Sequence, residues 1–131
     1  REQGTPEKPA AGIRVIREPR LREMSLGEWD GRYVSEIMER YPEEYRKRGE
    51  NLLSYKFGND SENFYDLRYR VMKGFRSILR REREAGGGKD VLIVAHQGVI
   101  GAILSDVRHT ELGEEIKKPV PNGGVVLADF T

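Results

Sequence analysis

A histidine that directly follows an apolar run is the first side chain in this sequence that could do chemistry. The chain contains only two histidines, and one of them, His96, ends the stretch VLIVAH and precedes Gln97 and Gly98. The apolar run at 91–95 predicts a strand buried on both faces, and the pattern at 98–107 predicts a helix. Since ligands of open α/β sheets bind beyond the C-terminal ends of the strands, His96 is expected at a ligand-binding position.

The expected helix start after His96 is suited to an anion. The first N–H groups of a helix have no partner inside it, and a glycine such as Gly98 allows a ligand to approach the backbone. A donor imidazole beside those N–H groups would suit a phosphoryl group. The alternative interpretation is that His96 ends the strand and bonds to a backbone carbonyl, and its position alone is compatible with both.

An acidic residue in a glycine-bearing loop is the second candidate. Glu23 follows a predicted strand and precedes Gly27 and Gly31, in the kind of loop that often carries catalytic groups. The alternative is a solvated surface charge. The single tryptophan, Trp29, is interpreted as a packing anchor for this loop, and His109 as a surface residue.

The elements that must position these residues alternate along the chain. Strands are expected at 13–21, 91–95 and 125–130, and helices at 32–41, 42–48, 62–85 and 98–107, with Asp60 or Ser61 as the cap of the long helix. This alternation predicts an α/β fold in which helices cover a layered, mostly parallel sheet. We expect one domain over 1–131, with a loop at 1–12 and a helical or lid insertion at 32–60.

Composition excludes several classes of function. The 23 basic and 22 acidic residues nearly cancel, so bulk charge predicts no nucleic-acid binding. The absence of cysteine excludes disulfides and thiolate metal sites and fits a cytoplasmic protein. No apolar run is long enough to predict a membrane-spanning helix. With one well-placed histidine and no cysteine, no metal site is expected.

Three motifs, in order, resemble the histidine phosphatase superfamily, the phosphoglycerate mutase-like group. They are PRLREMSLGEWDG, then SENFYDLRYR, in which Glu62, Asp66 and Arg70 match the motif positions, then VLIVAHQGVIGAIL. The resemblance runs from about residue 13 onward. It implies a sheet that is incomplete without the strand–helix unit with which the family begins.

The resemblance also implies roles for individual residues. Members form a phosphohistidine intermediate. His96 matches the histidine that holds phosphoryl oxygens, and Glu23 matches the general acid that protonates the leaving alcohol and then activates water. The amide of Gln97, with Gly98, would help to bind the phosphate, and neither a metal nor another cofactor is required. The expected substrate is a small phosphorylated metabolite.

Departures from the family pattern refine this prediction. Gln97 stands where many members have glycine, and Met24 with Ser25 favours a phosphatase over a glycolytic mutase. The family's R-H-G segment, which carries the nucleophilic histidine, is absent from these 131 residues.

Two hypotheses follow from the missing segment. The chain is either the larger part of a phosphatase that lacks its nucleophile segment, or an inactive relic that binds a phosphorylated ligand or a partner. In either case we expect a homo-oligomer, or a second chain that supplies the missing strand.

Overall fold

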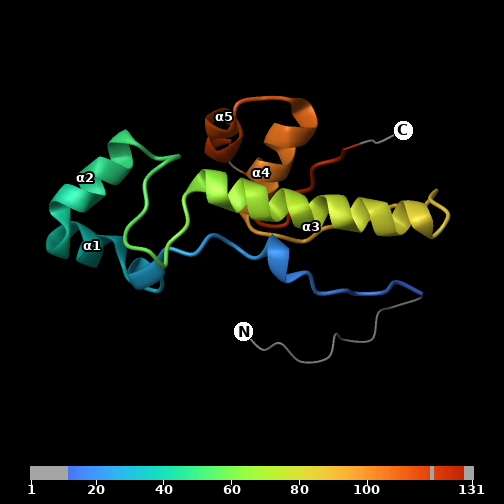
Figure 1. Cartoon of the computed structure of the whole chain (residues 1–131), viewed down its shortest axis with the longest axis horizontal. Helices are drawn as coiled ribbons and strands as arrows, with labels where there is room; N and C mark the ends of the chain where they lie inside the picture. Colours follow the sequence, from blue (N-terminus) through green and yellow to red (C-terminus); the bar gives the residue numbers. More distant parts are fainter. Residues whose placement is uncertain (1–11, 119, 129–131) are drawn as a thin grey trace.

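The structure, a computed structural model, describes residues 12–118 and 120–128. Figure 1 shows the long helix α3 (Phe64–Glu84), with α4 (Gln97–Arg108) and α5 (Leu112–Lys117) on one side of it and the segment that carries η1 (Pro19–Leu21) on the other. The elements in chain order are η1 (Pro19–Leu21), η2 (Gly27–Trp29), α1 (Val34–Arg40), α2 (Pro42–Glu50), α3 (Phe64–Glu84), α4 (Gln97–Arg108) and α5 (Leu112–Lys117).

The central helix α3 begins at a reciprocal capping box. The side chain of Asn63 accepts from the N–H of Asp66 at 2.8 Å, and the Asp66 carboxylate accepts from the N–H of Asn63 at 3.1 Å. This second bond is the main cause that lowers the pKa of Asp66. The two bonds satisfy backbone donors that a helix start leaves free. The cap is therefore Asn63, and the prediction of Asp60 or Ser61 was wrong.

The hydrophobic core forms where α3, α4 and α5 meet. Leu67 and Val71 of α3 are fully buried, as are Val99 and Ala102 of α4, and Leu112 of α5 completes the cluster. The spacing of four between Leu67 and Val71 places both on one face of α3. The long helix and the helix after His96 are thus confirmed close to their predicted limits, whereas α5 was not predicted.

The predicted α/β fold is contradicted by the structure. Residues 12–118 and 120–128 contain no sheet, and the one β-bridge outside named elements joins Leu26 to Ser61. The stretch 91–95 does not form a buried strand, because Leu92 is 80% and Val94 87% exposed. The predicted strand at 13–21 is also absent, and the third falls partly on residues 129–130, outside the described part.

The physical reason lies in what an apolar run can determine. Such a run favours burial, but a strand exists only where a second backbone offers hydrogen-bond partners. The described residues offer none to the three segments concerned. Apolar side chains that a sheet would cover are consequently exposed, among them Ile13, Val15, Val91, Leu92, Val94, Val125 and Leu127.

The stretch between η2 and α3 is organised by aromatic packing. Trp29 is only 3% exposed. Its ring stacks on Phe57 with a centroid distance of 4.7 Å, and Tyr55 and Tyr41 lie at 5.9 and 6.0 Å. Trp29 is therefore a packing residue in the structure. Pro42 occupies the first turn of α2, as predicted.

Across the described residues, none of the helices combines the length and apolar character needed to cross a membrane.

Candidate active site

The loop that follows η1 brings Glu23 to the start of α4. A β-carbon added to Gly98 would lie 2.7 Å from Glu23 Oε1, which places this carboxylate against the first turn of α4. The same oxygen accepts from the N–H of Met24 at 2.9 Å. Glu23 is exposed. The structure nevertheless brings together two segments that lie far apart in the sequence.

His96 is the residue immediately before α4. Its backbone is extended, with φ −78° and ψ 163°, and its carbonyl accepts the first helical bond, from Ile100 N–H at 3.0 Å. The imidazole is exposed and makes no capping bond to the helix. Within the described residues no hydrogen bond joins this imidazole to a backbone carbonyl, so the alternative interpretation gains no support. The imidazole is therefore accessible to a ligand.

The first turn of α4 presents backbone donors beside these two side chains. The N–H groups of Gln97, Gly98 and Val99 precede the first intrahelical bond, and α4 is a full helix of 12 residues. A helix N-terminus of this kind carries a partial positive charge and binds anions. The side chain of Gln97 turns away towards the end of α5, where Nε2 donates to Lys118 O at 3.2 Å. The backbone N–H of Gln97, and not its side-chain amide, is therefore the donor at the start of the helix.

One arginine holds the Glu23 loop. Arg70 of α3 donates Nη1–H to the carbonyl oxygens of Arg20 and Arg22, both at 2.9 Å, and Nη2–H to that of Glu23 at 3.4 Å. Its Nε and Nη2 also donate to the two carboxylate oxygens of Glu62, each at 2.8 Å. Arg70 and Glu62 are residues whose place beside the Glu23 loop sequence reasoning missed. Their match to a family motif was noted, but the motif did not reveal their contacts.

Glu62 connects this arginine to the other end of the loop. Its Oε1 accepts from Ser25 N–H at 2.9 Å, and its own N–H donates to Ser25 O at 2.8 Å. The bonds from Arg70, followed by the one from Ser25, lower the pKa of the Glu62 carboxyl against the opposing effect of burial. Glu62 is therefore a carboxylate at neutral pH and an acceptor for both partners.

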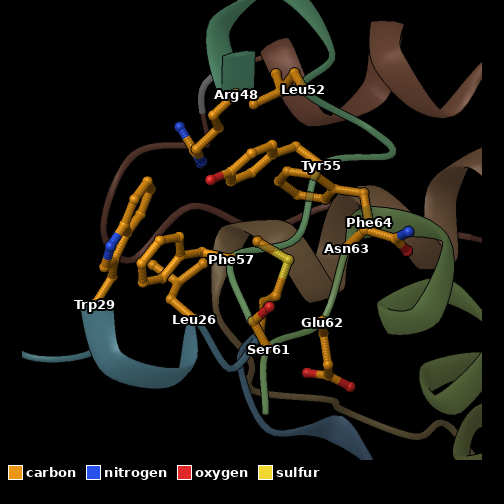
Figure 2. Close-up of a pocket in the computed structure, with 11 residues that line it drawn as sticks. Leu26, Trp29, Arg48, Leu52, Tyr55, Phe57, Ser61, Glu62, Asn63 and Phe64 are labelled. Atoms are coloured by element: carbon orange, nitrogen blue, oxygen red, sulfur yellow. The ribbon is translucent and has the colours of Figure 1, made fainter. Parts of the chain in front are cut away.

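A small pocket lies beside this loop (Figure 2). Its lining includes Trp29, Tyr55, Phe57 and Phe64, together with Glu62. Figure 2 shows the Glu62 carboxylate directed away from the aromatic rings. Neither Glu23 nor His96 lines this pocket. Glu23 and His96, the candidate catalytic residues, therefore lie outside this pocket, at the start of α4.

The arrangement can bind an anion and transfer a proton. Backbone N–H groups and an accessible imidazole are donors suited to phosphoryl oxygens, and a carboxylate beside them can carry a proton to or from a bound group.

Comparison with known proteins places this chain in a family. Residues 2–131 match the model of the histidine phosphatase superfamily (branch 1). Over 87 residues the chain is 34% identical to phosphoserine phosphatase 1 of Hydrogenobacter thermophilus, and the match covers 66% of this chain and 39% of that protein. Over 102 residues it is 30% identical to 6-phosphofructo-2-kinase 1 of Saccharomyces cerevisiae, covering 77% of this chain and 12% of that protein.

A solved structure agrees with the sequence comparisons. Bacillus stearothermophilus YhfR superposes with a TM-score of 0.60 at 28% identity, covering 76% of this chain and 47% of that one. The chain therefore spans less than half the length of each of these three relatives. The match to the family model runs over nearly the whole chain, and so the chain belongs to the histidine phosphatase superfamily (branch 1).

Proposed function

We propose that this chain carries the phosphate-binding and proton-transfer part of a phosphatase that hydrolyses small phosphomonoesters through a phosphohistidine. One observation carries the proposal: the Glu23 carboxylate lies against the first turn of α4, directly after His96. Membership of the superfamily and the name of the phosphoserine phosphatase relative support the class of reaction.

The proposed reaction has two steps. In the first, a nucleophilic histidine forms a P–N bond as the P–O bond of the ester breaks, and Glu23 gives a proton to the leaving alcohol. In the second, Glu23 takes a proton from water, whose oxygen displaces the histidine and releases inorganic phosphate. His96 and the N–H groups of Gln97 and Gly98 hold the phosphoryl oxygens throughout.

This reaction needs a histidine other than His96 as the nucleophile. The other histidine, His109, follows the last residue of α4. Because a helix rises about 1.5 Å per residue, the 13 steps from His96 to His109 across α4 separate the two residues by roughly 20 Å. That distance is too great for both imidazoles to contact one phosphoryl group. We therefore propose that the nucleophilic histidine comes from another part of the native protein or from a second chain.

The test uses the protein at its native length. Turnover of p-nitrophenyl phosphate and trapping of an acid-labile, base-stable phosphoenzyme should both be positive. Glu23→Gln should lower kcat by about 10²- to 10⁴-fold with little change in phosphate affinity, because it removes proton transfer and leaves the backbone donors in place. His96→Asn should weaken phosphate binding.

His109→Asn is the matched control. His109 adopts a left-handed backbone with φ 55°, which asparagine tolerates well, so turnover should be unchanged. A native-length protein that binds phosphate, forms no phosphohistidine and hydrolyses none of a panel of phosphomonoesters would instead favour the inactive, ligand-binding alternative.

A further inference from the structure

Resting on the proposed function, we propose that Arg70 and Glu62 are positioning residues, whose paired side chains hold the loop segment 20–25, which begins within η1, so that the Glu23 carboxylate meets the start of α4. Neither residue is placed against the phosphate site. Their effect on the reaction would act through the backbone of Glu23.

The Arg70 guanidinium is used completely. An arginine offers five N–H donors, and Arg70 makes five hydrogen bonds, three to loop carbonyls and two to Glu62. The three carbonyls are that of Glu23 itself and those of Arg20 and Arg22, which precede it closely in the chain. Lysine could supply at most three donors, and without the planar fork.

Glu62 connects the Arg70 guanidinium to Ser25, at the far end of the loop. Its Oε2 accepts from Arg70 Nε–H, and its Oε1 accepts from both Arg70 Nη2–H and the Ser25 N–H. The side chains of Arg70 and Glu62 are only 13% and 18% exposed, so water competes weakly for these bonds. Arg70 is anchored in α3, a helix of 21 residues whose core face is buried against α4. The pair therefore attaches the loop to α3, the helix against which α4 also packs.

The loop needs this attachment to α3 because it has little structure of its own. Residues 22–25 belong to no helix, and Glu23 is exposed. The Glu23 side chain makes one hydrogen bond within the described residues, to the N–H of its neighbour Met24. That contact does not orient the carboxylate relative to α4. The backbone bonds from Arg70 and Glu62 do, because they connect the loop to distant parts of the chain.

The experiment compares Arg70→Lys and Glu62→Gln in the native-length protein, with two substrates. A general acid matters more for an alkyl phosphate, whose alkoxide leaves poorly, than for p-nitrophenyl phosphate. We expect both variants to lower kcat at least about tenfold on glycerol phosphate and by a smaller factor on p-nitrophenyl phosphate. The KM for each substrate should change little. A role confined to folding would lower both rates by one factor.

Arg76→Lys is the matched control, since Arg76 lies on the same helix and forms an exposed ion pair with Asp106. It should leave both rates unchanged. Equal loss on the two substrates, no loss in either variant, or failure of both variants to fold would each overturn the proposal. The last result would mean that the pair is required for the fold itself.

Hydrogen exchange separates this proposal from the proposed function. The Ser25 amide, bonded to Glu62, should exchange faster in Arg70→Lys than in Arg76→Lys, whether or not the protein is active. If the wild type is inactive but the variants show this exchange pattern, the phosphatase proposal would be contradicted, and the attachment of the loop by Arg70 and Glu62 would still stand. If the wild type is active but Arg70→Lys changes neither the Ser25 exchange rate nor the substrate preference, the positioning role alone would be overturned.

Discussion

The carboxylate of Glu23 occupies the space that a side chain at position 98 would require. A β-carbon on Gly98 would lie 2.7 Å from Glu23 Oε1 and 3.4 Å from Glu23 Cδ. The nearest obstacle is the end of a flexible side chain, and not backbone. A methyl group at this position would therefore displace the carboxylate without opening the fold.

Gly98→Ala should consequently lower turnover while leaving the free energy of unfolding unchanged or raising it by up to about 1 kcal/mol, since alanine is the better helix former. Phosphatase assays and urea denaturation measure the two effects. Gly113→Ala in α5 is the control, because its β-carbon would meet only Leu53 Cδ1 at 3.6 Å, an ordinary contact. A Gly98→Ala protein with full activity would contradict the proximity argument.

Gly74→Ala should destabilise the protein. A β-carbon there would lie 2.9 Å from Arg20 Cβ, which is attached directly to the backbone of η1, so η1 must move. Overpacking of this kind costs about 1–3 kcal/mol, which exceeds the gain of up to about 1 kcal/mol in helix propensity. The free energy of unfolding in urea measures the sum. Gly49→Ala in α2, where nothing lies within 4 Å, should instead be neutral or stabilising.

Glu62→Gln should lower stability at neutral pH by about 1–3 kcal/mol, because it weakens hydrogen bonds to a charged arginine. The folded-state pKa of Glu62 lies below the 4.5 of the free side chain, so this contribution is present above pH 4.5 and is lost as the pH falls through the folded-state pKa. The stabilities of wild type and variant should therefore converge in acid.

Denaturation curves recorded from neutral to acid pH would show this convergence. The control is Glu36→Gln, which removes an exposed partner of Arg32 and should change little at any pH. A constant difference between wild type and Glu62→Gln down to the lowest pH would contradict the assignment of Glu62 as an ionised partner of Arg70.

Trp29 should report on the packing of the segment between η2 and α3. As the only tryptophan, and nearly buried against Phe57, it should show blue-shifted fluorescence that moves to the red on unfolding. Phe57→Ala should shift the native emission to the red and remove about 0.5–1.5 kcal/mol of ring pairing, beyond the apolar area lost. Tyr33→Ala, at an exposed ring, is the control. Unchanged emission in Phe57→Ala would contradict the stacked arrangement.

The sequence by itself determined the helices α1 to α4 and the family. The periodic apolar residues of α3 and α4 predicted both helices, because burial of one helix face imposes spacings of three and four that local inspection can detect. The position of His96 before a helix start followed from the same pattern. Three ordered motifs indicated the superfamily, and the family model confirms it.

The tertiary structure decided what depends on partners distant in the chain. The run at 91–95 predicted a buried strand, yet in the described residues no second backbone pairs with it, because pairing is a property of two segments and not of one. For the same reason the contact of Glu23 with the start of α4 and the bonds of Arg70 to three loop carbonyls have no local signature. Each requires α3 to pack against η1 and α4, and only the folded chain brings those surfaces together.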